Sequence, residues 1–388
     1  MGKIGLLSVY NHNYGSILQA YALQKKLNQL GYYNEIIRYK KTNYIKQAMR
    51  LLYFPLLKST FKMKWKKIYC KCFQKNIYSE ILLGRENEFN KFVKDNLNFS
   101  EVYCGRKKLV ESTKKYSAFV LGSDQVWNPM NLGGDFYTMS FVPDNKIKIA
   151  YAPSFGVAKI PDRQKNQTKN YLNRIDYISI REMDGVKIVY ELTGRKVQQV
   201  VDPTILIDRN IWDRLKGENR IVKEKYILCY FISAIPEYRD FAKELAKRTC
   251  LKIVSIPHVD EFVRSDVKFG DIVPDRVGPA QFVNLISNAE YVCTDSFHGS
   301  VFSTLYEIPF FTFSRYSGDG RDSTNSRLYS FLKMIGMENR LYSGTSGISD
   351  EDLTSPDFTE AKNKMNLMKQ ESENYLADAL KAIGNHQI

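Results

Sequence analysis

Strand-like and helix-like segments alternate along this chain of 388 residues from one end to the other. In the clearest unit, an apolar strand over 3–9 and a polar turn precede apolar residues at helical spacing, which end at Gly31. Such alternation predicts parallel β-sheets covered by helices. Because single hydrophobic cores stop growing at about 250–300 residues, the length favours two domains. The sequence therefore predicts an α/β protein with two Rossmann-like domains facing a cleft.

The alternation falls into two series, which set the expected domain boundary. The first series has strands at 3–9, 36–39, 118–121, 148–152, 177–180 and 197–201, and helices at 17–30, 86–97, 163–174 and 184–192. The second has strands at 226–232, 252–256, 291–294 and 310–313, and helices at 237–248, 280–287, 301–307 and 325–335. We expect a first domain at 1–205, a second at 206–345 and a C-terminal helix at 356–384. The cleft between the domains is the natural place for an active site.

Composition and cysteine usage are those of a globular protein from a reducing compartment. The apolar fraction is 44%, and the six cysteines form no Cys-x-x-Cys pair, so neither a disulfide framework nor a zinc site is indicated. The apolar start is too short for a signal peptide, and the apolar run at 51–57 is far shorter than the roughly 20 residues that span a bilayer. We expect a cytoplasmic protein.

The net charge of +15 is concentrated in one basic segment, residues 36–79. It holds twelve Lys or Arg and no Asp or Glu, mixed with aromatic and aliphatic side chains such as Phe54 and Trp65. This mixture favours an anionic membrane surface, where each cation adds about 1 kcal/mol. Nucleic acid is a weaker alternative because no nucleic-acid-binding motif is present. A solvated insertion without a role is the third. We expect peripheral association with the inner membrane face and no nucleic-acid partner.

Five polar clusters follow expected strands. They lie at residues 11–16, 122–129, 151–156, 179–182 and 295–300. Because ligands of open α/β sheets bind beyond the carboxyl ends of the strands, five such clusters indicate a shared rim. The last cluster also precedes a helix, whose N-terminal N–H groups favour an anion.

These clusters, in this order, resemble the polysaccharide pyruvyl transferase family. The most specific pieces are GSDQVWNP at 122–129, SIRE at 179–182, VDPT at 201–204 and DSFHGS at 295–300. The resemblance runs from NYGS at 13–16 to about Arg327 and leaves the basic segment outside. It implies a fold like the two-domain GT-B glycosyltransferases and phosphoenolpyruvate as the donor. It also implies a sugar acceptor destined for a surface polymer, with no required metal and no cofactor.

Phosphoenolpyruvate carries a carboxylate and a phosphate, so cations and helix N-termini should surround it. His298 at a helix start and Arg181 after a strand meet that need, and the resemblance places donor contacts at both. Arg181 could instead form an ion pair with Glu182 or with a neighbouring helix. The candidate donor-binding residues are Arg181, His298, Gly299, Ser300, Arg315 and Arg327.

Asp124 is, with His298, a candidate catalytic residue, because a carboxylate in a glycine-led loop could move a proton or orient a hydroxyl. Alternatively, Asp124 caps a helix that starts near Gln125. Trp127 could stack on a sugar or be buried, and Asp202 most simply fixes a turn before Pro203. The candidate acceptor-binding residues are Asn13, Tyr14, Gly15, Ser16, Ser123, Gln125 and Trp127.

The sequence thus predicts an enzyme that forms a pyruvate ketal on a lipid-linked or nucleotide-linked sugar. The alternative is a GT-B glycosyltransferase with a nucleotide-sugar donor, in which Glu307 would bind the ribose. A basic nucleic-acid-binding protein would explain the charge but would leave the strand-end clusters without a purpose.

Overall fold

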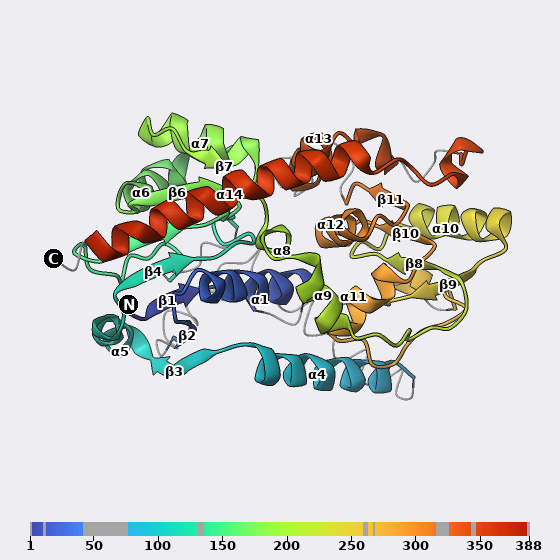
Figure 1. Cartoon of the computed structure of the whole chain (residues 1–388), viewed down its shortest axis with the longest axis horizontal. Helices are drawn as coiled ribbons and strands as arrows, with labels where there is room; N and C mark the ends of the chain where they lie inside the picture. Colours follow the sequence, from blue (N-terminus) through green and yellow to red (C-terminus); the bar gives the residue numbers. More distant parts are fainter. Residues whose placement is uncertain are drawn as a thin grey trace.

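Two parallel β-sheets, one in each half of the chain, form the frame of the protein (Figure 1). The computed structural model describes residues 2–10, 13–41, 77–130, 136–258, 263–266, 268–315, 326–342 and 347–385. The predicted α/β fold is confirmed, because each half of the chain forms a parallel sheet with strands and helices in alternation. The two sheets fall on either side of the expected boundary near residue 205.

The first sheet has seven strands in the order β3-β2-β1-β4-β5-β6-β7. They are β1 (Ile4–Leu7), β2 (Asn34–Lys40), β3 (Phe99–Cys104), β4 (Ala118–Leu121), β5 (Ile147–Ala150), β6 (Tyr177–Ile180) and β7 (Gln198–Gln199). The direction in which strands are added reverses between β1 and β4, which are parallel neighbours. The loops after these two strands therefore flank the switch point, where open α/β sheets bind ligands.

The second sheet has five strands in the order β12-β11-β10-β8-β9. They are β8 (Tyr226–Tyr230), β9 (Lys252–Ser255), β10 (Tyr291–Thr294), β11 (Phe310–Phe313) and β12 (Leu341–Tyr342). Here the switch point lies between β8 and β10. The Asp295 carboxylate joins the two loops, because it accepts bonds from the backbone N–H groups of Ile232 and Ser233 at 2.6 and 2.7 Å.

Helices cover both sheets (Figure 1). Those of the first half are α1 (Tyr14–Gln29), α4 (Ile77–Asn96), α5 (Gly105–Ser112), α6 (Asp162–Asn173), α7 (Met183–Thr193), α8 (Pro203–Leu206) and α9 (Arg209–Lys216). Those of the second half are α10 (Pro236–Thr249), α11 (Pro279–Ser287), α12 (Phe297–Tyr306), α13 (Ser326–Ile335) and α14 (Thr359–Asn385). Short 3-10 turns lie at Thr113–Lys115, Arg264–Asp266, Glu338–Arg340 and Glu351–Leu353.

Three helices begin at least three residues earlier than the sequence predicted, and one of them is α4, which starts at Ile77 and not at 86. α1 starts at Tyr14, where the Asn13 side chain accepts bonds from the N–H groups of Gly15 and Ser16. α12 starts at Phe297, where the Ser296 hydroxyl caps the N–H of Gly299. Both caps are short polar side chains of the usual N-cap type. Residues interpreted as loop are therefore first turns of helices, and their polar groups lie at helix N-termini.

The two domains share one hydrophobic core. The ring of Tyr14 on α1 stacks on Phe282 of α11 with centroids 4.6 Å apart, and Tyr21 packs against Trp212 of α9. The C-terminal helix α14 crosses from the second domain back over the first (Figure 1). There the Ser372 hydroxyl accepts a bond from the Val201 N–H at 3.0 Å. This shared core fixes the position of one switch point relative to the other.

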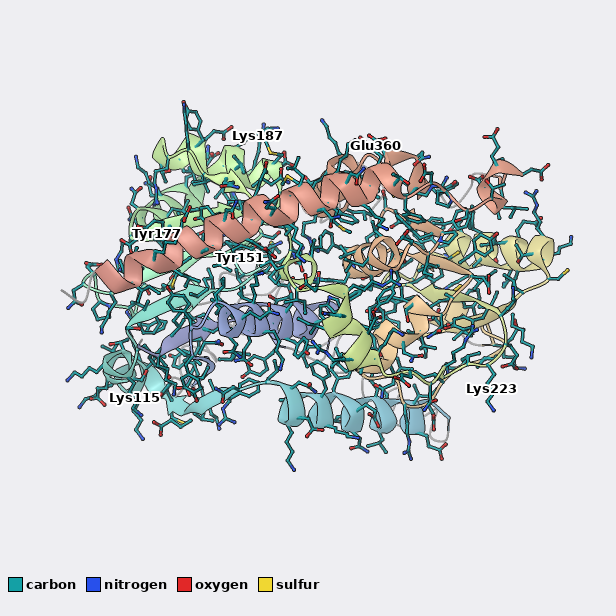
Figure 2. All side chains as sticks on the ribbon, viewed as in Figure 1. Lys115, Tyr151, Tyr177, Lys187, Lys223 and Glu360 are labelled. Carbon is teal, nitrogen blue, oxygen red and sulfur yellow. The ribbon has the colours of Figure 1, made fainter. Side chains whose placement is uncertain are left out.

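Charged side chains such as Lys187, Lys223 and Glu360 project from the periphery of the molecule (Figure 2). In the parts of the chain that the structure describes, every helix is too short or too polar to cross a membrane. The expected membrane-binding segment at 36–79 begins with the residues of β2, but its residues 42–76 lie outside the described residues. Its membrane role therefore stays a prediction.

Candidate active site

Residues from the strand-end clusters of both domains meet in a buried group where the domains join. Asp124 follows β4, Arg181 follows β6, and Asp202 precedes α8 in the first domain. His298 in the first turn of α12 and Arg327 on α13 come from the second domain. We call these five residues the charged cluster; ion pairs or short separations between charged groups link them.

Asp124 lies in a strained loop and not at a helix start. Its φ angle of 79° is in the left-handed region, which costs a residue other than glycine roughly 1–3 kcal/mol. The conformation is held because the backbone oxygen of Asp124 accepts bonds from the N–H groups of Val126 and Ser154 at 2.8 and 2.9 Å. No helix begins near Gln125 in this described stretch, so the helix-capping interpretation of Asp124 is wrong. In this conformation the carboxylate contacts Ser16 and Arg327 at the domain junction.

The Asp124 carboxylate is ionised despite its burial. Its Oδ2 accepts a 2.5 Å bond from the Ser16 hydroxyl, and its Oδ1 lies 3.7 Å from Arg327 Nη1. Burial alone would raise the pKa of Asp124, but the positive charges of Arg181 and Arg327 outweigh it and hold that pKa below its ordinary value. The Asp124 carboxylate can therefore orient a hydroxyl group of a ligand or accept its proton.

Arg181 pairs with Asp202, not with Glu182 as the sequence allowed. Arg181 Nη1 donates to Asp202 Oδ2 at 2.5 Å, and both side chains are buried. Asp202 Oδ1 accepts from the backbone N–H and the hydroxyl of Thr204 at 3.0 and 2.8 Å. Asp202 therefore caps α8, as the turn interpretation expected, and also anchors Arg181. Glu182 instead accepts bonds from Ser154 and Phe155.

His298 reaches across the domain junction toward Asp202. Its Nε2 lies 3.7 Å from Asp202 Oδ2, beyond hydrogen-bond length, and has no hydrogen-bond partner among the described residues although it is buried. On the other side of the ring, a Cβ added to Gly15 would lie 2.0 Å from His298 Nδ1. Only glycine at position 15 therefore leaves room for the imidazole. Gly15 therefore lies directly against a side chain of the other domain.

Both arginines of the charged cluster lie over the ring of Phe297. Their guanidinium carbons are 4.8 Å (Arg181) and 6.0 Å (Arg327) from the ring centroid. In the amide orientation that satisfies both of its polar atoms, Gln125 accepts bonds from Arg327 Nε and Nη2 at 3.2 and 2.7 Å. Burial, with repulsion from Arg181, lowers the pKa of Arg327 to about 9. An anionic ligand would stabilise this crowded positive charge.

Arg181 retains donors for such a ligand. Its Nε and Nη2 are buried and make no hydrogen bond within the described residues. Because a buried unpaired guanidinium N–H is costly, these atoms mark a place where a carboxylate or phosphate oxygen would be favourable. The charged cluster thus combines donors for a small anion with an ionised carboxylate and a histidine that can move protons.

Other candidate residues are placed outside direct reach of a ligand. Trp127 is fully buried, donates from Nε1 to the Tyr137 carbonyl at 3.1 Å and packs on Phe155, so it cannot stack on a sugar. Tyr14 is equally buried and donates to the Val277 carbonyl at 2.8 Å, which links the two domains. These two predicted acceptor contacts are therefore corrected to structural roles.

The remaining candidates surround the charged cluster. Asn13 caps α1, and Ser123 accepts from Arg181 Nη1 at 3.3 Å. Gly299 packs on Thr294, where an added Cβ would lie 2.6 Å from its hydroxyl. Ser300 is buried and donates to the Thr312 hydroxyl at 3.0 Å, so it lies behind the site. Arg315 donates to the Asp295 carbonyl at 2.9 Å, and its charge helps to lower the pKa of Arg327.

Sequence reasoning missed Asp202 and Phe297 as members of the site. Asp202 stood in the VDPT piece, but its placement before Pro203 equally predicts a turn. Phe297 stood beside His298 in the DSFHGS piece, where an aromatic residue next to a polar one gives no signal of an arginine platform. In both cases the partner is supplied by another segment of the chain.

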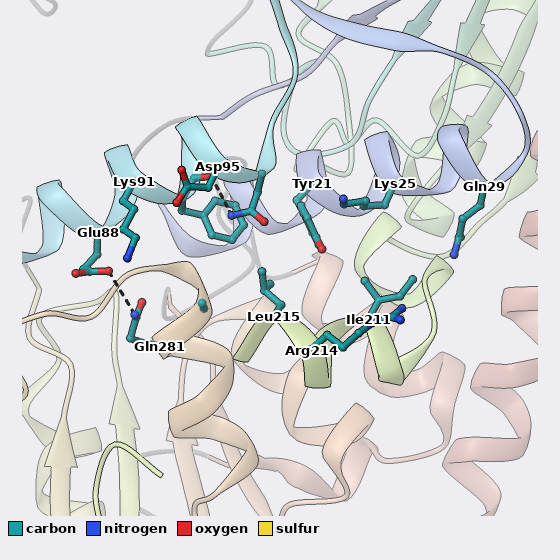
Figure 3. A pocket seen from close by; sticks show the side chains of 13 residues that line it. Tyr21, Lys25, Gln29, Glu88, Lys91, Asp95, Ile211, Arg214, Leu215 and Gln281 are labelled. Atoms are coloured by element: carbon teal, nitrogen blue, oxygen red, sulfur yellow. Dashed lines mark hydrogen bonds between the residues drawn. The ribbon is translucent and has the colours of Figure 1, made fainter. Parts of the chain in front are cut away.

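A separate groove of about 580 Å³ lies between α1, α4, α9 and α11 (Figure 3). Its charged residues are of both signs, for example Lys25, Arg214 and Glu88, and no residue of the charged cluster lines it.

Among the described residues, no three His, Cys, Asp or Glu side chains are grouped to hold a metal ion. Glu307, the ribose candidate, ends α12 and pairs with Arg209 and Lys362.

The family model for polysaccharide pyruvyl transferases matches residues 13–317. The chain belongs to the polysaccharide pyruvyl transferase family. The match includes every residue of the charged cluster except Arg327. The family indicates a pyruvyl transferase enzyme.

Comparison with other known proteins adds little beyond the family. No curated protein matches the chain. The UDP-GlcNAc 2-epimerase of Neisseria meningitidis is 11% identical, with 96% of this chain and 99% of that chain covered and a TM-score of 0.45. The wall teichoic acid polymerase TagF is 12% identical (99% and 89% covered, TM-score 0.49), and MurG of Acinetobacter baumannii is 11% identical (98% and 100% covered, TM-score 0.43). At these values the likeness does not extend to substrate or activity.

Proposed function

We propose that this pyruvyl transferase uses phosphoenolpyruvate to form a pyruvate ketal on a sugar of a surface-polysaccharide precursor. The observation that supports it best is the pair of buried, unpartnered donors on Arg181 beside the crowded Arg327. Two arginines and a helix N-terminus suit a ligand that carries a carboxylate and a phosphate on a three-carbon skeleton. Family membership supports the same donor class.

The reaction assigns distinct tasks to the charged cluster. A proton is added to the methylene carbon of the donor, and positive charge develops at C2. One sugar hydroxyl forms a bond to C2, the bond from C2 to the phosphate oxygen breaks, and a second hydroxyl closes the ring. Of the two hydroxyl protons, one replaces the proton given to the methylene carbon and the other leaves with phosphate. Asp124, whose pKa is lowered, is the base that receives the first hydroxyl proton.

Charge is handled in this proposal by arginine and by a helix end, without a metal or another cofactor. Arg327 and Arg181, which both lie over the ring of Phe297, hold the phosphate and carboxylate of the donor. In this proposal the acceptor hydroxyl approaches Asp124 beside three polar residues. Ser16 donates a hydrogen bond to Asp124, and Ser123 and Gln125 are its neighbours in the chain.

The acceptor in this proposal is a lipid-linked or nucleotide-linked sugar. The basic segment would hold the enzyme at the cytoplasmic membrane surface, beside acceptors carried on a lipid. The twelve cations of residues 36–79 support this location.

The function is tested by incubating the protein with phosphoenolpyruvate and a panel of lipid-linked and nucleotide-linked sugars. Release of inorganic phosphate together with an acceptor mass increased by one pyruvate ketal is expected. The His298→Ala protein serves as the matched control. Transfer of a sugar from a nucleotide-sugar, without phosphate release from phosphoenolpyruvate, would replace this function by that of a glycosyltransferase.

A further inference from the structure

We propose that Asp202 of the first domain is a positioning residue: its carboxylate faces His298 of the second domain, which is the proton donor to the methylene carbon of the substrate. This inference rests on the proposed function and identifies which residues supply its acid. The sequence did not show whether His298 or Asp124 is the acid. The different partners of the Asp124 and Asp202 carboxylates favour His298.

The two carboxylates of the charged cluster have different partners. Asp124 accepts a hydrogen bond from the Ser16 hydroxyl and faces Arg327, and among the described residues it forms no hydrogen bond with the imidazole.

 Asp202 has both oxygens engaged, Oδ1 by Thr204 and Oδ2 by Arg181, and it is this second oxygen that lies 3.7 Å from His298 Nε2. Asp202 is therefore fixed in position by Thr204 and Arg181, without any contribution from His298. Its carboxylate presents negative charge to the imidazole.

The imidazole itself is confined on both sides. Gly15 at the N-terminus of α1 closes the Nδ1 side, since even one added carbon would lie 2.0 Å from that nitrogen. On the other side Nε2 is buried and forms no hydrogen bond with any described residue. The ring can therefore carry a proton on Nε2 that no protein acceptor holds, beside a carboxylate that stabilises its positive form.

The charges that face the imidazole come from several elements. Asp124 after β4 and Asp202 before α8 act on the imidazole with their negative charges. Each of these carboxylates also pairs with an arginine, Asp124 with Arg327 on α13 and Asp202 with Arg181 after β6. Burial would raise the pKa of Asp202, but the charges of His298 and Arg181 hold it far below its ordinary value. Because its pKa is held so low, Asp202 is a poor proton donor, and we assign the acid to His298 instead.

The proton transfer balances. The imidazolium of His298 gives its Nε2 proton to the methylene carbon, whose double-bond electrons form the new C–H bond and leave C2 electron-poor. The first acceptor oxygen supplies the electron pair for the bond to C2, and its proton passes to Asp124. Phosphate then departs with the electrons of the C2–O bond and takes the proton from Asp124. The second hydroxyl forms its bond to C2 and closes the ring, and its proton returns to His298 Nε2. Asp202 takes no proton at any step and acts only through its charge and its hold on Arg181.

The test compares Asp202→Asn with Asp266→Asn. Asp266 is a matched control because it is another buried carboxylate paired with an arginine, Arg239, at 2.6 Å, outside the charged cluster. The kcat of the wild type for phosphoenolpyruvate-dependent transfer should fall as the pH rises and the acid is lost. In Asp202→Asn this alkaline limb should move to lower pH by roughly one unit or more, because an opposite charge that close shifts a titration by about that amount. Asp266→Asn should leave the limb unchanged.

A second measurement needs no substrate. The ring signals of His298, assigned by their loss in His298→Ala, are followed by NMR from pH 5 to 9 in the wild type and in Asp202→Asn. The titration should move to lower pH in the variant. If neither the alkaline limb of the kcat profile nor the titration of the His298 ring signals moves in Asp202→Asn, the proposed role of Asp202 is wrong. If no donor supports activity but the titration moves, the proposed function fails while the positioning role stands.

Gly15→Ala covers the case in which Asp202→Asn does not fold. Alanine suits a helix, so its main effect should be to displace the imidazole from Asp202. The same movement of the limb is expected with both carboxylates intact. A Gly15→Ala enzyme with the wild-type pH profile would contradict the placement on which the proposal depends.

Discussion

Arg327 on α13 faces Asp124 on the loop after β4, with Arg327 Nη1 3.7 Å from Asp124 Oδ1. This pair joins the second domain to the first within the charged cluster. Each partner is also surrounded by other groups, because Ser16 donates to Asp124 and Gln125 accepts from Arg327. Burial, together with the positive charge of Arg181, lowers the pKa of Arg327 to about 9, although Asp124 acts in the opposite direction.

The first prediction concerns the pH dependence of donor binding. Arg327 loses its charge as the pH rises through about 9, so affinity for phosphoenolpyruvate should be steady near neutral pH and fall above about 9. Titration calorimetry at pH 7.5 and 9.5 measures this. In Arg327→Gln the affinity should already be low at pH 7.5 and should change much less between the two values. Equal affinity of the wild type at both values would contradict the role of Arg327 in donor binding.

The second prediction concerns Asp124. Replacing Asp124 by Asn removes the base, so turnover should fall by roughly 10²–10⁴. Donor binding should be kept or strengthened, because a negative charge beside the donor site is lost. Steady-state kinetics and calorimetry on the same preparation separate the two effects. Normal turnover in this variant would leave Asp124 only its structural contacts with Ser16 and Arg327.

The third prediction concerns metal ions. Because arginine side chains and a helix N-terminus are proposed to neutralise the donor, activity should survive dialysis against EDTA. The assay is phosphate release before and after chelation. Loss of activity that magnesium or manganese restores would show that the charge of the donor is handled differently.

The sequence predicted most of the fold because buried parallel strands are short apolar runs between turn residues. β4, β6, β10 and β11 match their expected bounds. β3 was missed because it lies at the edge of its sheet, where the pattern FSEVYC alternates exposed and buried residues without an apolar run. The starts of α1 and α12 were set too late because their first turns hold glycine and polar residues, which are poor helix formers.

The site could be predicted in part. Asp124, Arg181, His298 and Arg327 were identified, and the structure brings them together. Their pairings could not be predicted, because the partners are far apart in the sequence: Asp202 and His298 are joined only by the packing of α1 and α8 against α12. Trp127 shows the opposite error, since a tryptophan in a polar motif gives no indication of whether it is exposed.

The fourth prediction concerns the basic segment. Binding to anionic vesicles should weaken steeply between low and physiological salt, because surface charges are screened within about 8–10 Å. Replacing Lys62, Lys64, Lys66 and Lys67 by Gln should release the protein from the vesicles without lowering its Tm. The matched control replaces four exposed lysines elsewhere, namely Lys107, Lys108, Lys159 and Lys169. Equal sedimentation of both variants with the vesicles would remove the membrane role.

The central claim is that the charged cluster binds phosphoenolpyruvate, and a thermal-shift measurement tests it most directly. At 100 times its Kd, the donor should stabilise the wild-type protein by about 2.7 kcal/mol, and His298→Ala should abolish the effect. Full stabilisation of His298→Ala by phosphoenolpyruvate, or no stabilisation of the wild type by phosphoenolpyruvate, would contradict the account.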